Sequence, residues 1–153
     1  MAAHHPWHTY GDKRGTRHHK GKGWSDQIGI VPHFWLNGHA HLLQFGEYDA
    51  AVGQEGRTVA AVTSGAAGKL RSKKRQLAIE CGPYEGEMRC DPENDGLQFA
   101  RSTYGYAVLR LTGNNARLVF KRVDGEPLFV WERNLDEPMG IHLPLSTSTT
   151  SAP

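Results

Sequence analysis

The sequence predicts a strand-rich fold for this 153-residue chain, on three observations. Eighteen glycines and eight prolines interrupt the chain often, which favours strands and loops over long helices. The apolar residues fall in short runs, and no stretch has the pattern of a clear amphipathic helix. Three stretches near the end alternate apolar and polar residues, as half-buried strands do. The length suits one ordinary domain with a core of its own.

The first half of the chain combines a histidine-rich loop with two expected strands. Residues 1–27 hold five of the nine histidines and are rich in glycine, so they have little helix potential. The apolar run IGIVPHFWL (28–36) predicts a short buried strand that Pro32 disturbs. The run RTVAAVTSG (57–65) predicts a second strand, which leads into the small-residue turn SGAAGK.

The last third predicts an antiparallel meander of three strands. The strands are YGYAVLRLT (104–112), ARLVFKRV (116–123) and PLFVWER (127–133), and GNN and DGE form the turns between them. The final residues, 143–153, are low in complexity and are expected to be disordered, which leaves residues 1–142 as the domain.

Composition disfavours two classes of partner. A net charge of +2 is too small to indicate nucleic acid, and no apolar run approaches the roughly 20 residues that span a bilayer. The N-terminus lacks the apolar core of a signal peptide. Cys81 and Cys90 could form a disulfide, but two cysteines do not decide the redox compartment.

Two histidine pairs are the candidate metal ligands. His39 and His41 follow the first expected strand, and in extended chain both rings would project to the same side. Neutral imidazole binds zinc and similar ions, although two surface histidines in a turn would have the same spacing. His4 and His5 precede Pro6, which ends the strand before it. Histidines at two strand ends can meet at one sheet edge, where ligands bind beyond the carboxyl ends.

The motifs AAHHPWHTYG and NGHAHLLQ resemble the last two metal-binding motifs of the calcineurin-like metallophosphoesterases. The purple, or tartrate-resistant-type, acid phosphatase branch is the most similar, and Trp7 and the turn VTSGAAGK also match it. The resemblance covers residues 1 to about 134. It implies an α/β fold in which residues 1–142 form the β-rich C-terminal part of the αββα sandwich, including the antiparallel meander.

The resemblance also implies a function and a set of site residues. His4, His39 and His41 correspond to metal ligands, and His8 lies where the family places a phosphate-contacting or proton-donating histidine. His5 is a poorer match to a ligand, because the family's histidine is followed by one residue and then proline. In that family two metal ions, Fe with Fe, Zn or Mn, activate a water that hydrolyses phosphoric monoesters. Members of the branch are mostly exported or compartmentalised.

The chain departs from the family by lacking three further metal-site motifs, two of them with carboxylates, that precede these histidines. Aspartate-x-histidine, glycine-aspartate-x-x-aspartate or tyrosine, and glycine-asparagine-histidine are all missing. We therefore expect at most one metal ion in this chain alone, and little turnover of a phosphomonoester substrate. One alternative is a non-catalytic metal-binding or interaction remnant of the fold. Another is a basic nucleic-acid binder using residues 13–22 and 69–75, which the low net charge disfavours.

Overall fold

Strands are the regular elements of the described part of the protein. A computed structural model describes residues 1–7, 9–12, 16–18, 31–49, 58–68, 70, 83–84, 87–88 and 96–136. No helix lies among these residues, and hence none there that could cross a membrane. The cysteine pair and the tail 143–153 fall outside them.

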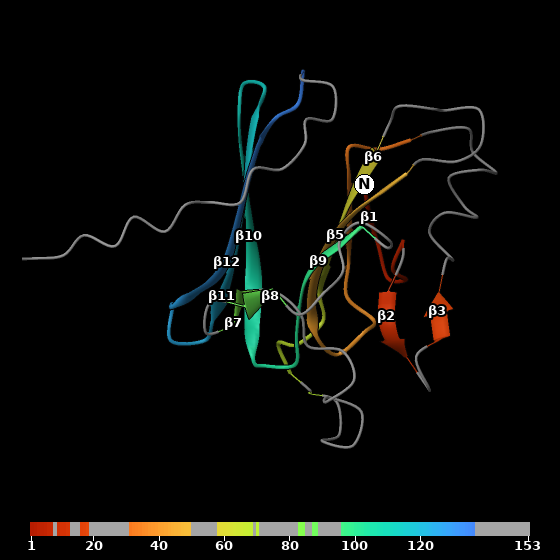
Figure 1. Cartoon of the computed structure of the whole chain (residues 1–153), viewed down its shortest axis with the longest axis vertical. Coiled ribbons are helices and arrows are strands. Elements are labelled where there is room, and N and C mark those ends of the chain that lie inside the picture. Colours follow the sequence, from red (N-terminus) through yellow and green to blue (C-terminus); the bar gives the residue numbers. More distant parts are fainter. Residues whose placement is uncertain are drawn as a thin grey trace, which may run out of the picture.

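A mixed five-stranded sheet forms the centre of the structure (Figure 1). β4 is parallel to its neighbours β1 and β6, whereas β5 is antiparallel to β6 and to β9. The strand expected over residues 28–36 begins only at Phe34, since Pro32 has no N–H to donate to a ladder. The sheet order is β1 (Ala2–Ala3), β4 (Phe34–Asn37), β6 (Thr58–Ser64), β5 (Leu43–Asp49) and β9 (Leu97–Arg101).

The C-terminal meander is confirmed as a three-stranded antiparallel sheet. Gly113 and Gly125 lie in its two turns at φ values of 56° and 92°, a region that favours glycine. The strands are β10 (Gly105–Thr112), β11 (Asn115–Arg122) and β12 (Pro127–Asn134). Two short hairpins complete the described strands: β2 (Thr9–Asp12) with β3 (Thr16–His18), and β7 (Pro83–Tyr84) with β8 (Glu87–Met88).

The main core lies between the meander and the five-stranded sheet, which stand side by side in Figure 1. Phe99 of β9 stacks on Phe129 of β12 and Phe120 of β11, with ring centroids 5.0 and 5.1 Å apart. Phe45 of β5 contacts Trp131 of β12, and their ring centroids are 5.2 Å apart. These aromatic pairs join the two sheets by burial of large apolar surfaces.

The other face of the five-stranded sheet carries a second core. Trp7 and Trp35 pack edge to face with centroids 5.4 Å apart, and the cluster also includes Tyr48, Val59 and Ala61. Burial on both faces explains why β6 is a continuous run of small and β-branched residues with no polar alternation. The β-rich character and the mixed sheet agree with the expected fold. Helices that an α/β sandwich would add are not among the described residues.

A polar network around Glu47 of β5 also joins the two sheets. Its side chain is only 8% exposed, and it accepts hydrogen bonds from Gln98 at 2.7 Å and from the Trp131 indole at 3.3 Å. Arg133 of β12 donates to Glu47 Oε1 at 3.0 Å and to Thr58 at 3.3 Å. The carboxylate is therefore a shared acceptor for donors from β9 and β12.

We expect Glu47→Ala to lower the free energy of unfolding by about 3 kcal/mol, because it removes the acceptor of a mostly buried ion pair. Urea unfolding of the purified chain measures this. The matched control is Glu132→Ala, which breaks the exposed pair between Arg117 and Glu132 on the outside of the meander. That change should cost less than about 1 kcal/mol. Equal losses for the two variants would contradict a special role for Glu47.

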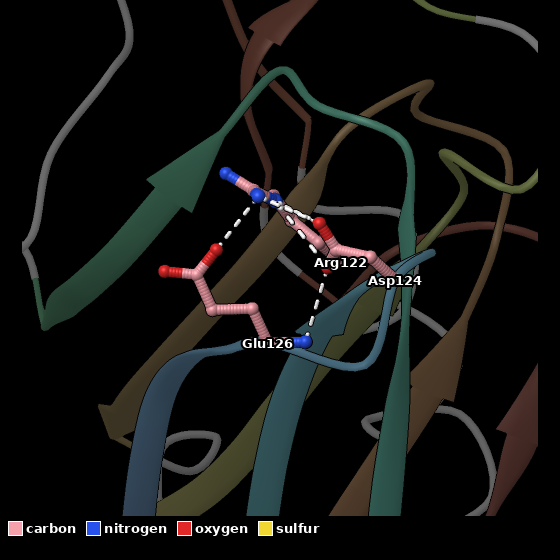
Figure 2. A network of polar contacts seen from close by, with 3 residues as sticks. All are labelled: Arg122, Asp124 and Glu126. Atoms are coloured by element: carbon pink, nitrogen blue, oxygen red, sulfur yellow. Dashed lines mark hydrogen bonds and ion pairs between the residues drawn. The ribbon is translucent and has the colours of Figure 1, made fainter.

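An ion-pair cluster closes the β11–β12 turn (Figure 2). Arg122 donates to Asp124 at 2.6 Å and pairs with Glu126 at 2.7 Å, while the Glu126 N–H donates to the Asp124 carboxylate at 3.1 Å. The hydrogen bond from Arg122 is the main reason that the pKa of Asp124 lies below its ordinary value. Because the folded-state pKa is lowered, the contribution of this bond is present at neutral pH and is lost as pH falls through the folded value.

We expect Arg122→Ala to raise the pKa of Asp124 toward its ordinary value. The measurement is an NMR titration of the carboxyl carbons, and Arg117→Ala on the same strand is the control. An unchanged Asp124 titration in Arg122→Ala would show that backbone hydrogen bonds, and not Arg122, lower this pKa.

Candidate functional site

The parallel pairing of β1 with β4 brings the two histidine motifs to one edge of the sheet. Ala2 pairs with Leu36 and Ala3 with Asn37. The Met1 ammonium donates to the Phe34 carbonyl at 2.9 Å, and the Leu36 N–H donates to the Met1 carbonyl at the same distance. Both strands end at this edge, so the motifs that follow them start side by side. This confirms that the histidines lie beyond the carboxyl ends of neighbouring strands.

His4 and His39 are in direct contact at this edge. Their nitrogens, His4 Nε2 and His39 Nδ1, are 2.9 Å apart, and one donates to the other according to the tautomer. The ring centroids are 4.8 Å apart, and the rings meet edge to face. Two of the three predicted metal ligands are therefore brought together, although they are 35 positions apart in the sequence.

His5 joins this pair, which the sequence did not lead us to expect. Its ring centroid is 4.6 Å from that of His39 and 5.2 Å from that of His4. No signal in either motif indicates it, because the β1–β4 pairing ends at Ala3 and Asn37 and the rings meet in the chain beyond these strands. Register is a property of the paired strands and is not visible in either motif alone.

His41 is placed differently from our expectation. Residues 38–42 lie outside any strand, and His39 has a φ of 25°, so the extended geometry that would align both rings is not present. The Leu42 N–H donates to the Ala40 carbonyl at 2.8 Å, which makes a tight turn centred on His41. The His41 ring is half-buried and makes no ring contact with His4, His5 or His39 among the described side chains. The expectation of an extended backbone from His39 to His41 is therefore wrong.

The second core fixes the backbone of the first motif. The Trp35 indole donates to the His5 carbonyl at 2.9 Å, and Pro6 and Trp7 directly after it are buried. Trp35 lies in β4, four positions before His39, and is itself fully buried. A core side chain of β4, the strand that leads into the second motif, therefore holds the main chain of the first motif.

Gly65 fixes the backbone of the second motif. It follows β6, and its N–H donates to the Leu42 carbonyl at 3.1 Å. A Cβ at this position would overlap the Ala40 carbonyl oxygen and lie 2.6 Å from the Gly38 carbonyl oxygen. The small-residue turn after β6 is thus required for the close approach of this turn to the histidine loop.

Two buried polar side chains lie at the same end of the sheet. Asn37 and Thr63 are cross-strand partners on β4 and β6, and the Asn37 amide donates to the Val62 carbonyl at 3.1 Å. Within the described residues, Asn37 Oδ1 and Thr63 Oγ1 have no hydrogen-bond partner. Buried polar atoms are nearly always satisfied, by water where protein groups do not reach them. An ordered water is therefore the expected partner of these two buried atoms.

The described side chains do not form a complete metal centre. Among them, no three His, Cys, Asp or Glu side chains are arranged as a ready metal site, and no carboxylate joins the histidines. The rings of His4, His5 and His39 pack edge to face, with interplanar angles from 61° to 79°. His8, the expected proton donor or phosphate contact, lies outside the described residues.

We expect Gly65→Ala to displace the Gly38–Ala40 main chain and to lower stability by about 1–3 kcal/mol, as overpacking does. Chemical shifts of His39 and its neighbours, together with urea unfolding, measure both effects. Gly68→Ala is the control, because a Cβ at Gly68 would meet nothing within 4 Å. Unperturbed His39 signals in Gly65→Ala would show that the loop does not depend on this close approach.

Comparison with known proteins assigns no family to the chain. No protein-family model matches it. A search of curated proteins also finds no matching relative. The resemblance to the metallophosphoesterases therefore remains a prediction that depends on the two histidine motifs, and the function is argued from the site.

Proposed function

We propose that this chain supplies the histidine side of a metal-dependent phosphomonoesterase site of the calcineurin-like, acid-phosphatase type. The observation that supports it best is the 2.9 Å approach of His4 Nε2 to His39 Nδ1 beyond the ends of two adjacent parallel strands. This is where ligands bind in open sheets with parallel strands. The proposal includes the α/β sandwich, of which the described β-rich part would be one portion.

The nitrogen separation suits a shared metal ion. Imidazole nitrogens bind zinc at about 2.0–2.1 Å. Two such bonds that meet at a right angle place the nitrogens about 2.9 Å apart, and a tetrahedral angle places them a few tenths of an ångström further apart. A small rotation of the two exposed rings would therefore exchange the hydrogen bond between them for two metal bonds.

Each histidine of the proposed metal site has its own role. His4 and His39 would hold the ion, and His41 is the further ligand that the family resemblance implies. When bound, metal ions in such a site polarise the phosphoryl group and lower the pKa of a bound water. The polar end of β4 and β6, with Asn37 and Thr63, lies in the same region. Carboxylates for a second ion would have to come from outside the described residues.

A second candidate function is non-catalytic metal binding. The observation in its favour is the lack of any carboxylate grouped with the histidines in the described part of the chain. Without such groups nothing balances the charge of two cations. This candidate shares the single histidine-bound ion with the first, but it requires no contact with a phosphate ester.

The two candidates are separated by a paramagnetic NMR experiment. With Co²⁺ bound to the chain, the phosphatase proposal expects the ³¹P line of p-nitrophenyl phosphate to broaden, since the ester would bind at the ion. Broadening should persist in His33→Ala, whose exposed histidine lies just before β4, away from the carboxyl-end edge, and disappear in His4→Ala and His39→Ala.

Two outcomes would count against the phosphatase. Cobalt binding without ³¹P broadening would leave metal binding alone as the function. Broadening of equal size in His39→Ala would place the ion elsewhere in the chain and overturn the proposed site.

A further inference from the structure

The edge of the C-terminal meander at β10 carries few of the features that protect sheet edges. β10 is an outer strand of this sheet, and it pairs with β11 over eight consecutive residues without a bulge. The opposite edge strand, β12, begins at Pro127, and a bulge interrupts its pairing with β11 between Phe120 and Lys121. Proline, bulges and charges keep edge strands from pairing with other chains. β10 has one charged residue and no proline, so its edge is suited to pairing with a further strand.

Large apolar side chains are exposed along this strand. Tyr106, Val108 and Leu111 are three of the six large hydrophobic residues exposed in the described part of the chain, and a fourth, Tyr104, directly precedes the strand. Because side chains alternate between the two faces of a strand, Tyr106 and Val108 lie on one face of the sheet and Leu111 lies on the other. A strand added beside β10 would therefore bury apolar surface on both faces.

The backbone of β10 directs hydrogen-bonding groups to this edge beyond Ala107. The Ala107 N–H points away from β11 and donates to the Ser64 hydroxyl at the end of β6, at 3.2 Å. In an antiparallel ladder, every second residue directs its N–H and C=O to the same neighbour. Leu109 and Leu111 therefore direct theirs to the same side as Ala107, and within the described residues the structure gives them no partner there. Two donors and two acceptors thus face the position of a further strand.

The charges on the outer face of the meander indicate what such a strand would carry. Arg110 of β10 lies opposite Arg117 of β11, which lies opposite Glu132 of β12 and forms an ion pair with it. No described carboxylate forms an ion pair with Arg110, and like charges directly opposite one another are unfavourable. The adjacent row is apolar, since Val108 lies opposite Val119. A further strand would therefore be favoured by a carboxylate beside Arg110 and an apolar side chain beside Val108.

We infer that the β10 edge binds an extended segment of a partner protein, which adds a fourth strand to the meander. In this segment an acidic residue lies opposite Arg110, and an apolar residue two positions away lies opposite Val108. Main-chain hydrogen bonds to Leu109 and Leu111 hold the segment, and the side-chain rows select it. A second copy of this chain paired through β10 does not meet this requirement, because GYAVLRLT contains no acidic residue. The inference uses none of the histidines and does not depend on the proposed phosphatase function.

The test is a titration of the full 153-residue chain, labelled with ¹⁵N, with the synthetic heptapeptide acetyl-TVTETVT-amide. The peptide sequence is the same in both directions, so the glutamate has a valine two positions away whichever way the strand runs. We expect the Leu109 and Leu111 amide signals to shift on binding and their hydrogen exchange to slow. The Val108 and Arg110 amides, which face β11, should keep their exchange rates. A peptide with lysine in place of the glutamate should bind roughly fivefold more weakly, because it places a like charge opposite Arg110.

Charge reversal at Arg110 is the matched control for this preference. Arg110→Glu should reverse it, so that the lysine peptide binds more tightly than the glutamate peptide. Lys121→Glu changes a charge on β11, one strand in from the edge, and should leave the preference as it is in the wild-type chain. Arg110 is exposed, and Arg110→Glu places a carboxylate opposite Arg117, so this variant should keep the wild-type unfolding midpoint. If it does not fold, Arg110→Gln, which should abolish the preference, replaces it in the same titration.

Several results would contradict this assignment. Equal affinity for the two peptides, or binding of neither, would exclude an edge that selects an acidic strand. A preference for the glutamate peptide that survives Arg110→Glu would place the peptide elsewhere on the chain. Slow exchange of the Leu109 and Leu111 amides in the free chain would show that this edge is already paired, and a dimer in sedimentation would then identify a second copy as the occupant. None of these results affects the ³¹P experiment, so this inference and the phosphatase proposal can fail separately.

Discussion

The pairing of the two-residue strand β1 with β4 is the constraint on which the candidate site depends. Its hydrogen bonds are few, but they are supplemented by the Met1 ammonium, which donates to the Phe34 carbonyl, and by the indole of Trp35, which donates to the His5 carbonyl. The pairing of only two residues of β1 with β4 therefore determines which histidines meet. A shift of the register by one residue would turn the following side chains to opposite faces of the sheet.

The rest of the fold keeps this edge in place. β6 is buried on both faces, since it separates the aromatic core shared with the meander from the Trp7 and Trp35 cluster. β4 lies beside it, and the turn after β6 packs on the histidine loop through Gly65. A change in the packing of the core would therefore displace the histidine loop, because Gly65 and its hydrogen bond to the Leu42 carbonyl connect this loop to β6. The Glu47 network strengthens the same arrangement at the contact between the two sheets.

Much of the fold follows from local patterns. The alternation over residues 104–133 gave the three strands and both turns of the meander, because a half-buried strand needs that period. The run over residues 57–65 predicted β6, because its small and β-branched residues are continuous. For β4 the pattern overestimated the length at the N-terminal side, where Pro32 prevents ladder hydrogen bonds. The helices of the expected α/β class left no periodic signal in the sequence and have no counterpart among the described residues.

The sequence by itself placed imidazoles directly after two expected strands, and this predicted that the two histidine motifs would meet at one edge of the sheet, whereas the choice of His4 over His5 came from the family resemblance. Only the tertiary structure decided that His5 joins them and that His41 lies in a tight turn apart from them. The physical reason is that spacing along one chain specifies facing side chains only while the backbone is regular. Beyond the end of a strand, contacts with other segments, such as the close approach of the turn at Gly65, set the positions instead.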